Sequence, residues 1–236
     1  MKKIIVHILD LLGYQIKRLK HIKNNEYQIY TILKNEDPDV ILDVGANRGQ
    51  FAMDLIRNGW NSDIISFEPM SVEHSVLRKR AERYENWRVW DRCAVGEKSD
   101  SLEIKIANNS VSSSLLSTTE KHLNAEPSSR SEKTEKVPVI NLSSVLKCLN
   151  YESIAIKIDV QGYEKAVLLG LMDRWDRITM LIVELSQVEL YLGQWLEENV
   201  IEFLDSKGFE LITRIPGFID PISGMTLQYD GVFKRR

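Results

Sequence analysis

The stretch VILDVGANRGQF, residues 40–51, decides the fold of this chain. It opens with the apolar run of a strand that is buried on both faces, and the run stops abruptly at Gly45. A helix is predicted directly after the turn, at about residues 48–58. A glycine-rich turn between a buried strand and a helix is typical of Rossmann-like α/β domains, which bind their ligands at this place.

Strands and helices alternate along the rest of the chain. Further buried strands are predicted at residues 63–69, 87–95, 154–160 and 178–185, and helices at about 71–85, 163–170 and 194–207. The last two strands, FELITRI and TLQYDGVFK, are predicted to form a hairpin, which makes the final strand antiparallel. We therefore expect an α/β fold, with a mostly parallel seven-stranded sheet, an antiparallel C-terminal strand and helices on both faces.

Residues 107–136 interrupt this alternation. They are rich in Ser, Thr, Asn, Lys and Glu and contain few large apolar side chains. A stretch this polar inside a compact domain is either disordered or a functional loop, so we expect a mobile lid over a binding site. Regular structure is predicted to resume at VPVINLSSVLKCL, as a short strand that enters a helix.

The chain is predicted to hold one domain, residues 37–236, preceded by an N-terminal helical segment, residues 1–36. The 236 residues are 43% hydrophobic and 28% charged, as in an ordinary globular protein with one sizeable core. The apolar run at the start is too short to span a bilayer, and no cleavage site of a signal peptide follows it. Helices are predicted there at about residues 4–23 and 25–35.

The first of these helices ends in a basic cluster, Lys17, Arg18, Lys20 and Lys23. Two roles stay open for this helix. It could pack on the domain or on a second subunit, or it could make peripheral contact with an anionic membrane surface. The two cysteines lie far apart and lack metal-ligand spacing, which is typical of reduced thiols in the cytoplasm. We expect a cytoplasmic protein, with any membrane contact limited to the inner face. The oligomeric state stays open.

The turn after the first strand distinguishes two classes of cofactor. The dinucleotide fingerprint G-x-G-x-x-G would require glycine at three positions where this chain has Gly45, Asn47 and Gln50. The methyltransferase pattern acid-x-G-x-G-x-G finds Asp43, Gly45, Asn47 and Gly49, and asparagine tolerates the positive φ of the glycine it replaces. The turn therefore favours S-adenosylmethionine, with an NAD-dependent dehydrogenase as the weaker alternative.

A second signal is Glu68, which ends the second strand 25 residues after Asp43. A carboxylate at this place can accept hydrogen bonds from both hydroxyls of a ribose, and the alternative is an acid that caps the next helix. By the same topology the end of the third strand faces the adenine. The predicted cofactor-binding residues are Asp43, Gly45, Ala46, Asn47, Gly49, Glu68, Pro69, Cys93, Ala94 and Asp159.

Acids also end the fourth and fifth predicted strands, at Asp159 and Glu184. Ligands of such sheets bind in the crevice at the carboxyl ends of the strands, so both acids are candidates for catalysis. Asp159 is the first candidate base, and His122 is the second if the polar stretch closes over the site. The alternative is that the acids cap helices or pair with Lys157 and Arg174. A divalent metal held by carboxylates stays open.

Taken together, the motifs of this sequence resemble those of the FkbM family of methyltransferases over about residues 40–234. The marks are ILDVGANRGQF, SFEP, AVG, SVSSSL, INLSSVL and IKIDVQGYEKAVLLG followed by VEL. The resemblance implies a class I methyltransferase fold and transfer of a methyl group from S-adenosylmethionine, commonly to a hydroxyl oxygen. Acceptors in the family include sugars, polyketides and other small molecules.

By position, the resemblance gives cofactor roles to Asp43, Gly45, Asn47, Gly49 and Glu68. Its second motif matches Asp159, Gln161, Gly162 and Glu164. Relatives often carry an acid after the leucine of the INLSSVL segment, whereas Ser143 and Ser144 follow Leu142 here. The choice of acceptor can therefore differ from theirs.

The expected function is O-methylation of a hydroxyl on a sugar, a glycan or another small molecule. One alternative is methylation of an RNA ribose, which could use the cluster Lys157, Asp159 and Glu184. A net charge of −3 and the absence of a basic stripe argue against nucleic acid as a partner. The other alternative is an inactive scaffold that binds S-adenosylmethionine, which the presence of Asp43 and Glu68 disfavours.

Overall fold

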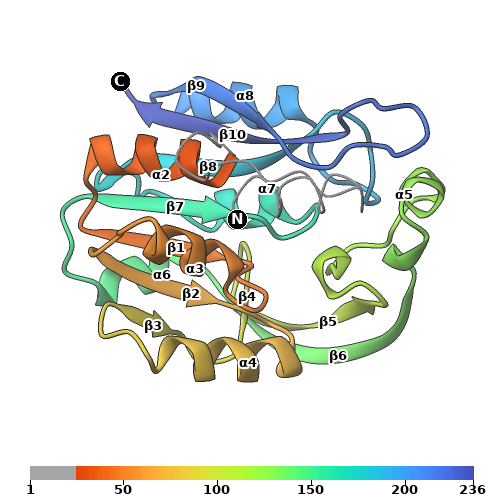
Figure 1. Ribbon diagram of the computed structural model, residues 1–236, viewed down its shortest axis with the longest axis horizontal. Coiled ribbons are helices and arrows are strands. Elements are labelled where there is room, and N and C mark those ends of the chain that lie inside the picture. Colours follow the sequence, from red (N-terminus) through yellow and green to blue (C-terminus); the bar gives the residue numbers. More distant parts are fainter. Residues whose placement is uncertain (1–24) are drawn as a thin grey trace, which may run out of the picture.

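The computed structural model describes residues 25–236, so the helix predicted at about residues 4–23 and its membrane contact lie outside the described residues. The central sheet contains β1 (Val40–Val44), β2 (Asp63–Phe67), β3 (Trp87–Val89), β7 (Ile154–Ile158), β8 (Ile178–Ser186), β9 (Phe209–Pro216) and β10 (Gln228–Arg235). Their order is β3-β2-β1-β7-β8-β10-β9 (Figure 1). All neighbours pair in parallel except β10, which is antiparallel to β8 and β9. The predicted sheet is confirmed.

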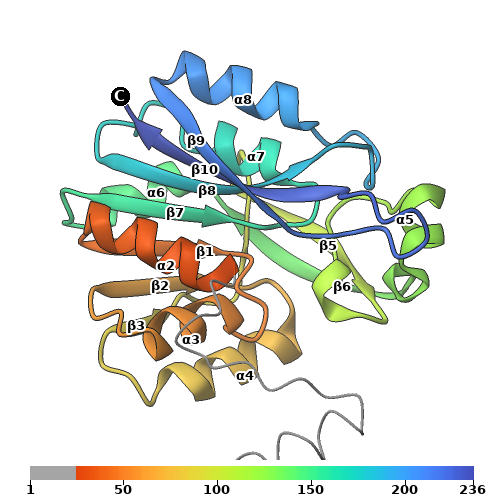
Figure 2. The same cartoon turned by 45° about the horizontal axis from the view of Figure 1, so that its top comes forward.

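Helices cover both faces of this sheet (Figure 2). One face carries α2 (Asn25–Glu36), α3 (Gln50–Arg57) and α4 (Ser71–Ala81), and the other carries α6 (Leu142–Cys148), α7 (Glu164–Leu169) and α8 (Glu197–Ser206). Successive side chains of a strand point to opposite faces. In β7, Ile154, Ile156 and Ile158 accordingly pack with α6, α7 and α8, while Ala155 packs in the core under α2, α3 and α4.

The same alternation sorts the charged residues of the strands. Asp43, Lys157 and Glu184 each lie two positions after an apolar residue of the core under α2, α3 and α4. Asp230, on the antiparallel strand β10, lies two positions before Val232 of that core and pairs directly with Glu184. Period-two alternation therefore brings these four charged residues to one face, at the carboxyl ends of β1, β7 and β8.

A second, three-stranded sheet corrects two expectations. It has the order β4-β6-β5, from β4 (Ala94–Val95), β5 (Asp100–Ala107) and β6 (Ser131–Ile140). The strand predicted at 87–95 is therefore split, because the chain leaves the central sheet after Val89 and pairs with β6 instead. The Arg92 guanidinium stabilises this passage of the chain from one sheet to the other by donating to the carbonyls of Pro69 and Lys136.

The second correction concerns the polar stretch 107–136. The expectation that its last part lacks regular structure is wrong, because residues 131–139 form a ladder with β5. Residues 132–134 are exposed on consecutive positions, so no hydrophobic alternation marks this part of the strand.

We call the rest of the polar stretch, residues 108–130, the cap. It holds η2 (Ser110–Ser112), α5 (Glu120–Ala125) and η3 (Pro127–Ser129), and lies beyond the carboxyl ends of β1 and β7 (Figure 1). An apolar cluster joins Ala125 and Leu116 of the cap to Leu190, Tyr191 and Leu227. That the cap moves as a lid stays a prediction.

Candidate functional site

A cavity of about 450 Å³ opens at the carboxyl ends of the parallel strands, where the order of the sheet reverses between β1 and β7. This reversal is the usual ligand site of open α/β sheets. The β1–α3 turn and the end of β2 form one wall. The end of β7, residues of α3 and the first part of the cap form a second wall, which meets the first at Gly45. The cavity therefore has room for a ligand between a turn and a group of charged side chains.

The turn on the first wall depends on Gly45. Its φ is 82°, in the left-handed region, and its amide donates to the Phe67 carbonyl at 3.1 Å. A Cβ at this position would come within 1.9 Å of the backbone oxygen of Asp159. Asn47 also has a positive φ, of 48°, as predicted for the asparagine that replaces a glycine. The absence of a side chain at Gly45 therefore lets the turn lie directly against the end of β7.

Glu68 lies on the same wall and is almost fully buried. Its Oε2 accepts from the Asn47 amide at 2.7 Å and its Oε1 from the Met70 amide at 2.8 Å. Burial raises the pKa of this carboxyl to about 8, although the two amides oppose the shift. Each oxygen keeps a further lone pair, so the carboxyl can bind both amides and still accept bonds from a ligand.

Asp43 is fully buried behind the turn and does not line the cavity. Its Oδ2 accepts from the Ser66 hydroxyl at 3.2 Å, and its Oδ1 lies 3.9 Å from the Lys157 ammonium. Burial raises the pKa of Asp43, which Lys157 and Ser66 partly offset. Asp43 therefore has no direct contact with the cavity, and its charge affects the cavity through Lys157.

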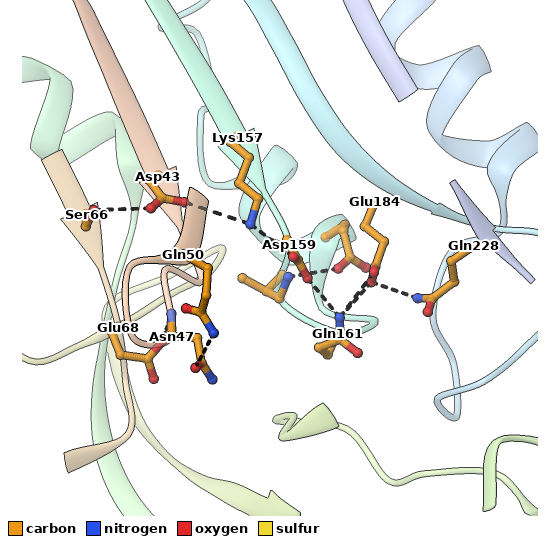
Figure 3. A network of polar contacts seen from close by, with 12 residues as sticks. Asp43, Asn47, Gln50, Ser66, Glu68, Lys157, Asp159, Gln161, Glu184 and Gln228 are labelled. Carbon is orange, nitrogen blue, oxygen red and sulfur yellow. Dashed lines mark hydrogen bonds and ion pairs between the residues drawn. The ribbon is translucent and has the colours of Figure 1, made fainter. Parts of the chain in front are cut away.

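Lys157 lies at the centre of a polar network on the second wall (Figure 3). Its Nζ donates to Asp159 Oδ2 at 3.0 Å and lies 5.5 Å from the centre of the Phe51 ring. Burial alone would lower the pKa of this ammonium, but the carboxylates of Asp159 and Asp43 outweigh burial and raise it. Lys157 is therefore a fixed positive charge beside the cavity.

Gln161 extends the network to the neighbouring strand (Figure 3). Its Nε2 donates to Asp159 Oδ1 at 2.8 Å and to both oxygens of Glu184, at 3.2 and 3.0 Å. Gln228 donates to Glu184 from the other side, at 2.7 Å. Burial, followed by the charge of Asp159, raises the pKa of Glu184. The two acids predicted at strand ends are therefore joined through one carboxamide.

The structure brings most of the predicted residues together. Those that line the cavity are Gly45, Ala46, Asn47, Glu68, Pro69, Cys93, Ala94 and Asp159. Gly49 does not line it and packs against the Trp87 ring, where a Cβ would come within 2.5 Å. Glu184 does not line the cavity itself, and it is bonded to the lining residue Gln161.

His122 lies apart from the cavity, on α5 of the cap. Its ring is buried, 5.0 Å from the centre of the Tyr191 ring and 5.7 Å from that of Phe218. Burial lowers the pKa of His122, so the ring is neutral near pH 7. In this arrangement it packs the cap and has no contact with the groups on the cavity wall.

Several lining residues were not predicted as part of the site. They include Phe51, Ser110, Ser113, Ser114, Tyr163 and Asp230. Lys157, which had appeared as an ion-pair partner and in the RNA-ribose alternative, and Gln161, which had appeared as part of a motif, also line the cavity. The serines belong to the SVSSSL segment, whose unusual composition was the available signal. Asp230 could have been found from the alternation of the last strand.

Residues 25–236 contain neither a group of side chains suited to a metal nor a helix suited to cross a membrane. No group of three or more His, Cys, Asp or Glu side chains is arranged there to hold a metal. Within the same residues, no helix combines the length and apolarity of a membrane span.

Comparison with known proteins gives matches along most of the chain. A family model described as Methyltransferase FkbM domain matches residues 43–211. The 2-O-methyltransferase NoeI of Sinorhizobium fredii is 26% identical over 196 residues, which cover 80% of this chain and 79% of the relative. The 31-O-demethyl-FK506 methyltransferase FkbM of Streptomyces tacrolimicus is 26% identical over 198 residues, or 75% and 74% of the two chains. Methyltransferase 1 of Beauveria bassiana is 27% identical over 206 residues, or 81% and 80%.

Proposed function

Because this chain belongs to the FkbM family of S-adenosylmethionine-dependent methyltransferases, we propose that it transfers the methyl group to a hydroxyl oxygen of a saccharide or another small molecule. Two of the relatives carry names that specify transfer to oxygen, which supports this choice of acceptor atom. The observation that carries the proposal is the cavity itself, which has the Gly45 turn and Glu68 on one wall and Lys157 and Asp159 on the other.

The first wall fits S-adenosylmethionine. Glu68 would hold the ribose hydroxyls, because it is the buried carboxyl among the residues that line this wall. Backbone groups of Gly45, Ala46 and Asn47 would line the amino acid end, since the missing Cβ of Gly45 lets this turn lie directly against the end of β7. Cys93 and Ala94 would border the adenine. When bound, the cofactor supplies a methyl group on a positively charged sulfur, which is the electrophile.

The second wall would activate the acceptor. Asp159 would take the proton of the acceptor hydroxyl as that oxygen bonds to the methyl carbon and the bond from this carbon to the sulfur breaks, which leaves S-adenosylhomocysteine as the other product. A positioned base of this kind contributes about 10²- to 10⁴-fold. The Lys157 ammonium holds Asp159 Oδ2 in place and orients the carboxylate toward the cavity. Ser113 and Ser114 of the cap offer hydroxyls that suit a polyhydroxylated acceptor.

We place the reaction in the cytoplasm, with the acceptor as the only required partner besides the cofactor. Cys93 and Cys148 are both free thiols, as is usual for a reducing compartment. Peripheral contact with the inner membrane surface through residues 1–24 belongs to the same proposal and rests on their basic cluster.

The test is methyl transfer from isotope-labelled S-adenosylmethionine to a panel of free saccharides, polyketides and a ribose-bearing RNA. Label on a hydroxyl oxygen of a saccharide or polyketide, located by mass spectrometry, supports the proposal. Label on RNA ribose would replace it with the nucleic-acid alternative. Micromolar cofactor binding without transfer to any member of the panel would favour an inactive scaffold.

Replacing Glu68 with glutamine is expected to weaken the binding of S-adenosylmethionine about 10- to 100-fold, because two bonds to a charged acceptor are lost. The free carboxyl has a pKa of about 8 and the ribose favours its ionised form. Binding at pH 7 should therefore release a proton, and affinity should fall as the pH decreases below 8. Calorimetry in buffers of different ionisation enthalpy measures the release, which Glu68→Gln should abolish. An unchanged proton release in the variant would assign it to another group.

A further inference from the structure

Gln161 has a backbone conformation that a residue other than glycine rarely adopts. Its φ is +56°, two residues after Asp159 in the loop that follows β7. Such a conformation persists where the surrounding contacts determine it, and these positions cluster at functional sites. Here the conformation turns the side chain back toward the acids at the ends of β7 and β8 (Figure 3).

The carboxamide of Gln161 separates two carboxyl groups. Its Nε2 donates to Asp159 Oδ1 at 2.8 Å and to Glu184 at 3.0 Å. The second oxygen of Asp159 accepts from Lys157, so both oxygens of this carboxylate are held. Neighbouring carboxylates repel when both are ionised, and an amide N–H₂ between them relieves the repulsion without adding a charge.

The opposite end of the same side chain is bonded to the loop after β8, and its backbone to the cap. Gln161 Oε1 accepts from the Tyr191 hydroxyl at 2.7 Å, which fixes the end of the amide that faces the acids. The Gln161 carbonyl accepts from Ser114 Oγ of the cap at 2.6 Å. Tyr191 also lies close to Gly162, where a Cβ would come within 2.7 Å of the tyrosine Cβ.

We infer that Gln161 is a positioning residue, which holds the Asp159 carboxylate for the proposed methyl transfer and couples its place to the cap. The inference rests on the proposed function, because it assumes that Asp159 is the base. The Gln161 carboxamide does not ionise near neutral pH and cannot serve as a base, so it acts through Asp159 rather than on the acceptor. Ordering of Ser114, which lines the cavity, against an acceptor would then stabilise the base in the same step.

The test compares the pH dependence of kcat/KM in the full chain and in Gln161→Glu. The charged groups that interact with Asp159 are Lys157 of β7, Asp43 of β1, Glu164 of α7 and Glu184 of β8, and Asp230 of β10 lies beside Glu184. Gln161→Glu adds a carboxyl, so one more proton must leave before the base is free. The acidic limb should move upward by roughly one to three pH units.

Gln161→Ala should lower kcat about 100-fold, as expected when a reacting group is misplaced, and leave the Kd of S-adenosylmethionine near that of the wild type. Tyr191→Phe should lower kcat roughly three- to tenfold, because the amide loses one bond that orients it. Gln228 provides the matched control, since it donates to Glu184 and Ser186 rather than to Asp159. Gln228→Leu should not move the acidic limb upward.

Coincident acidic limbs in Gln161→Glu and the wild type would overturn the inference. If Gln161→Glu does not fold, Tyr191→Phe decides the matter, and an unchanged kcat in that variant overturns the inference as well. Failure of the proposed function has a different signature, namely an Asp159→Asn variant that transfers methyl groups at the wild-type rate.

Discussion

Replacing Asp159 with asparagine is expected to lower kcat by about 10²- to 10⁴-fold, while the Kd of S-adenosylmethionine stays near the wild-type value. Asparagine keeps the shape of the side chain but cannot take a proton from a hydroxyl. The residues proposed to hold the cofactor lie on the other wall of the cavity, around Gly45 and Glu68. Single-turnover rates with labelled cofactor, together with calorimetry, separate the two effects.

Asp54 provides a matched control for this substitution. It also lines the cavity, but its carboxylate pairs with Arg57 at the surface, at 3.1 Å. Loss of an exposed ion pair costs about 1 kcal/mol or less, so Asp54→Asn should keep kcat within about fivefold. Equal losses in Asp54→Asn and Asp159→Asn would mean that the charge of the cavity, rather than a base, limits the rate.

Replacing Gly45 with alanine is expected to abolish detectable binding of S-adenosylmethionine. The added Cβ would lie 1.9 Å from the backbone oxygen of Asp159, so the turn or the end of β7 must move. Either movement displaces the amides of Ala46 and Asn47, and the second also displaces the proposed base. Because Gly45 has a φ of 82°, alanine adds conformational strain to the collision.

Gly208 provides a control that separates the conformational strain from the collision. Its φ is 84°, almost the same as that of Gly45, but a Cβ there would meet nothing within 4 Å. Gly208→Ala should lower the free energy of unfolding by about 1–2 kcal/mol and leave cofactor affinity unchanged. Thermal unfolding and calorimetry of both variants provide the comparison. A Gly45→Ala variant that binds S-adenosylmethionine like the wild type would contradict the prediction, because it would show that the turn accepts a Cβ beside Asp159 without moving.

The parts of the site that could be predicted from the sequence lie at the ends of strands. Buried apolar runs mark the central strands, and the residue after each run lies at the edge of the sheet where ligands bind. This rule places Gly45, Glu68 and Asp159 on the cavity, and the structure brings all three there. Asn47 could be predicted as a turn residue because few side chains tolerate a positive φ.

The contacts among these residues could not be predicted, because they depend on the register between strands that are distant in the sequence. Lys157 meets Asp43 because the two are direct partners in the β1–β7 pair. Glu184 faces Asp230 for the same reason, on β8 and β10. Alternation within one strand assigns a face to each side chain but does not say which residue stands beside it.

His122 and β6 show a second limit, in segments without a clear hydrophobic pattern. A single histidine in a polar stretch was expected near the acceptor, but α5 turns its ring toward Tyr191 and Phe218. Strand β6 begins with the polar residues SEKTEK, whose backbone is paired with β5 while most of the side chains stay in solvent. Backbone pairing of this kind leaves little trace in the composition.

The position of β10 between β8 and β9 has a consequence for biosynthesis. A chain leaves the ribosome from its N-terminus, so β8 and β9 are both available before the strand that joins them. Until residues 228–235 follow, each keeps an unpaired edge, which is where sheets of different molecules associate. Gln228 and Asp230 arrive on that same strand, so the surroundings of Glu184 are completed last. Translational pausing before residue 228 would therefore expose the nascent chain to aggregation at the stage when its site is still unfinished.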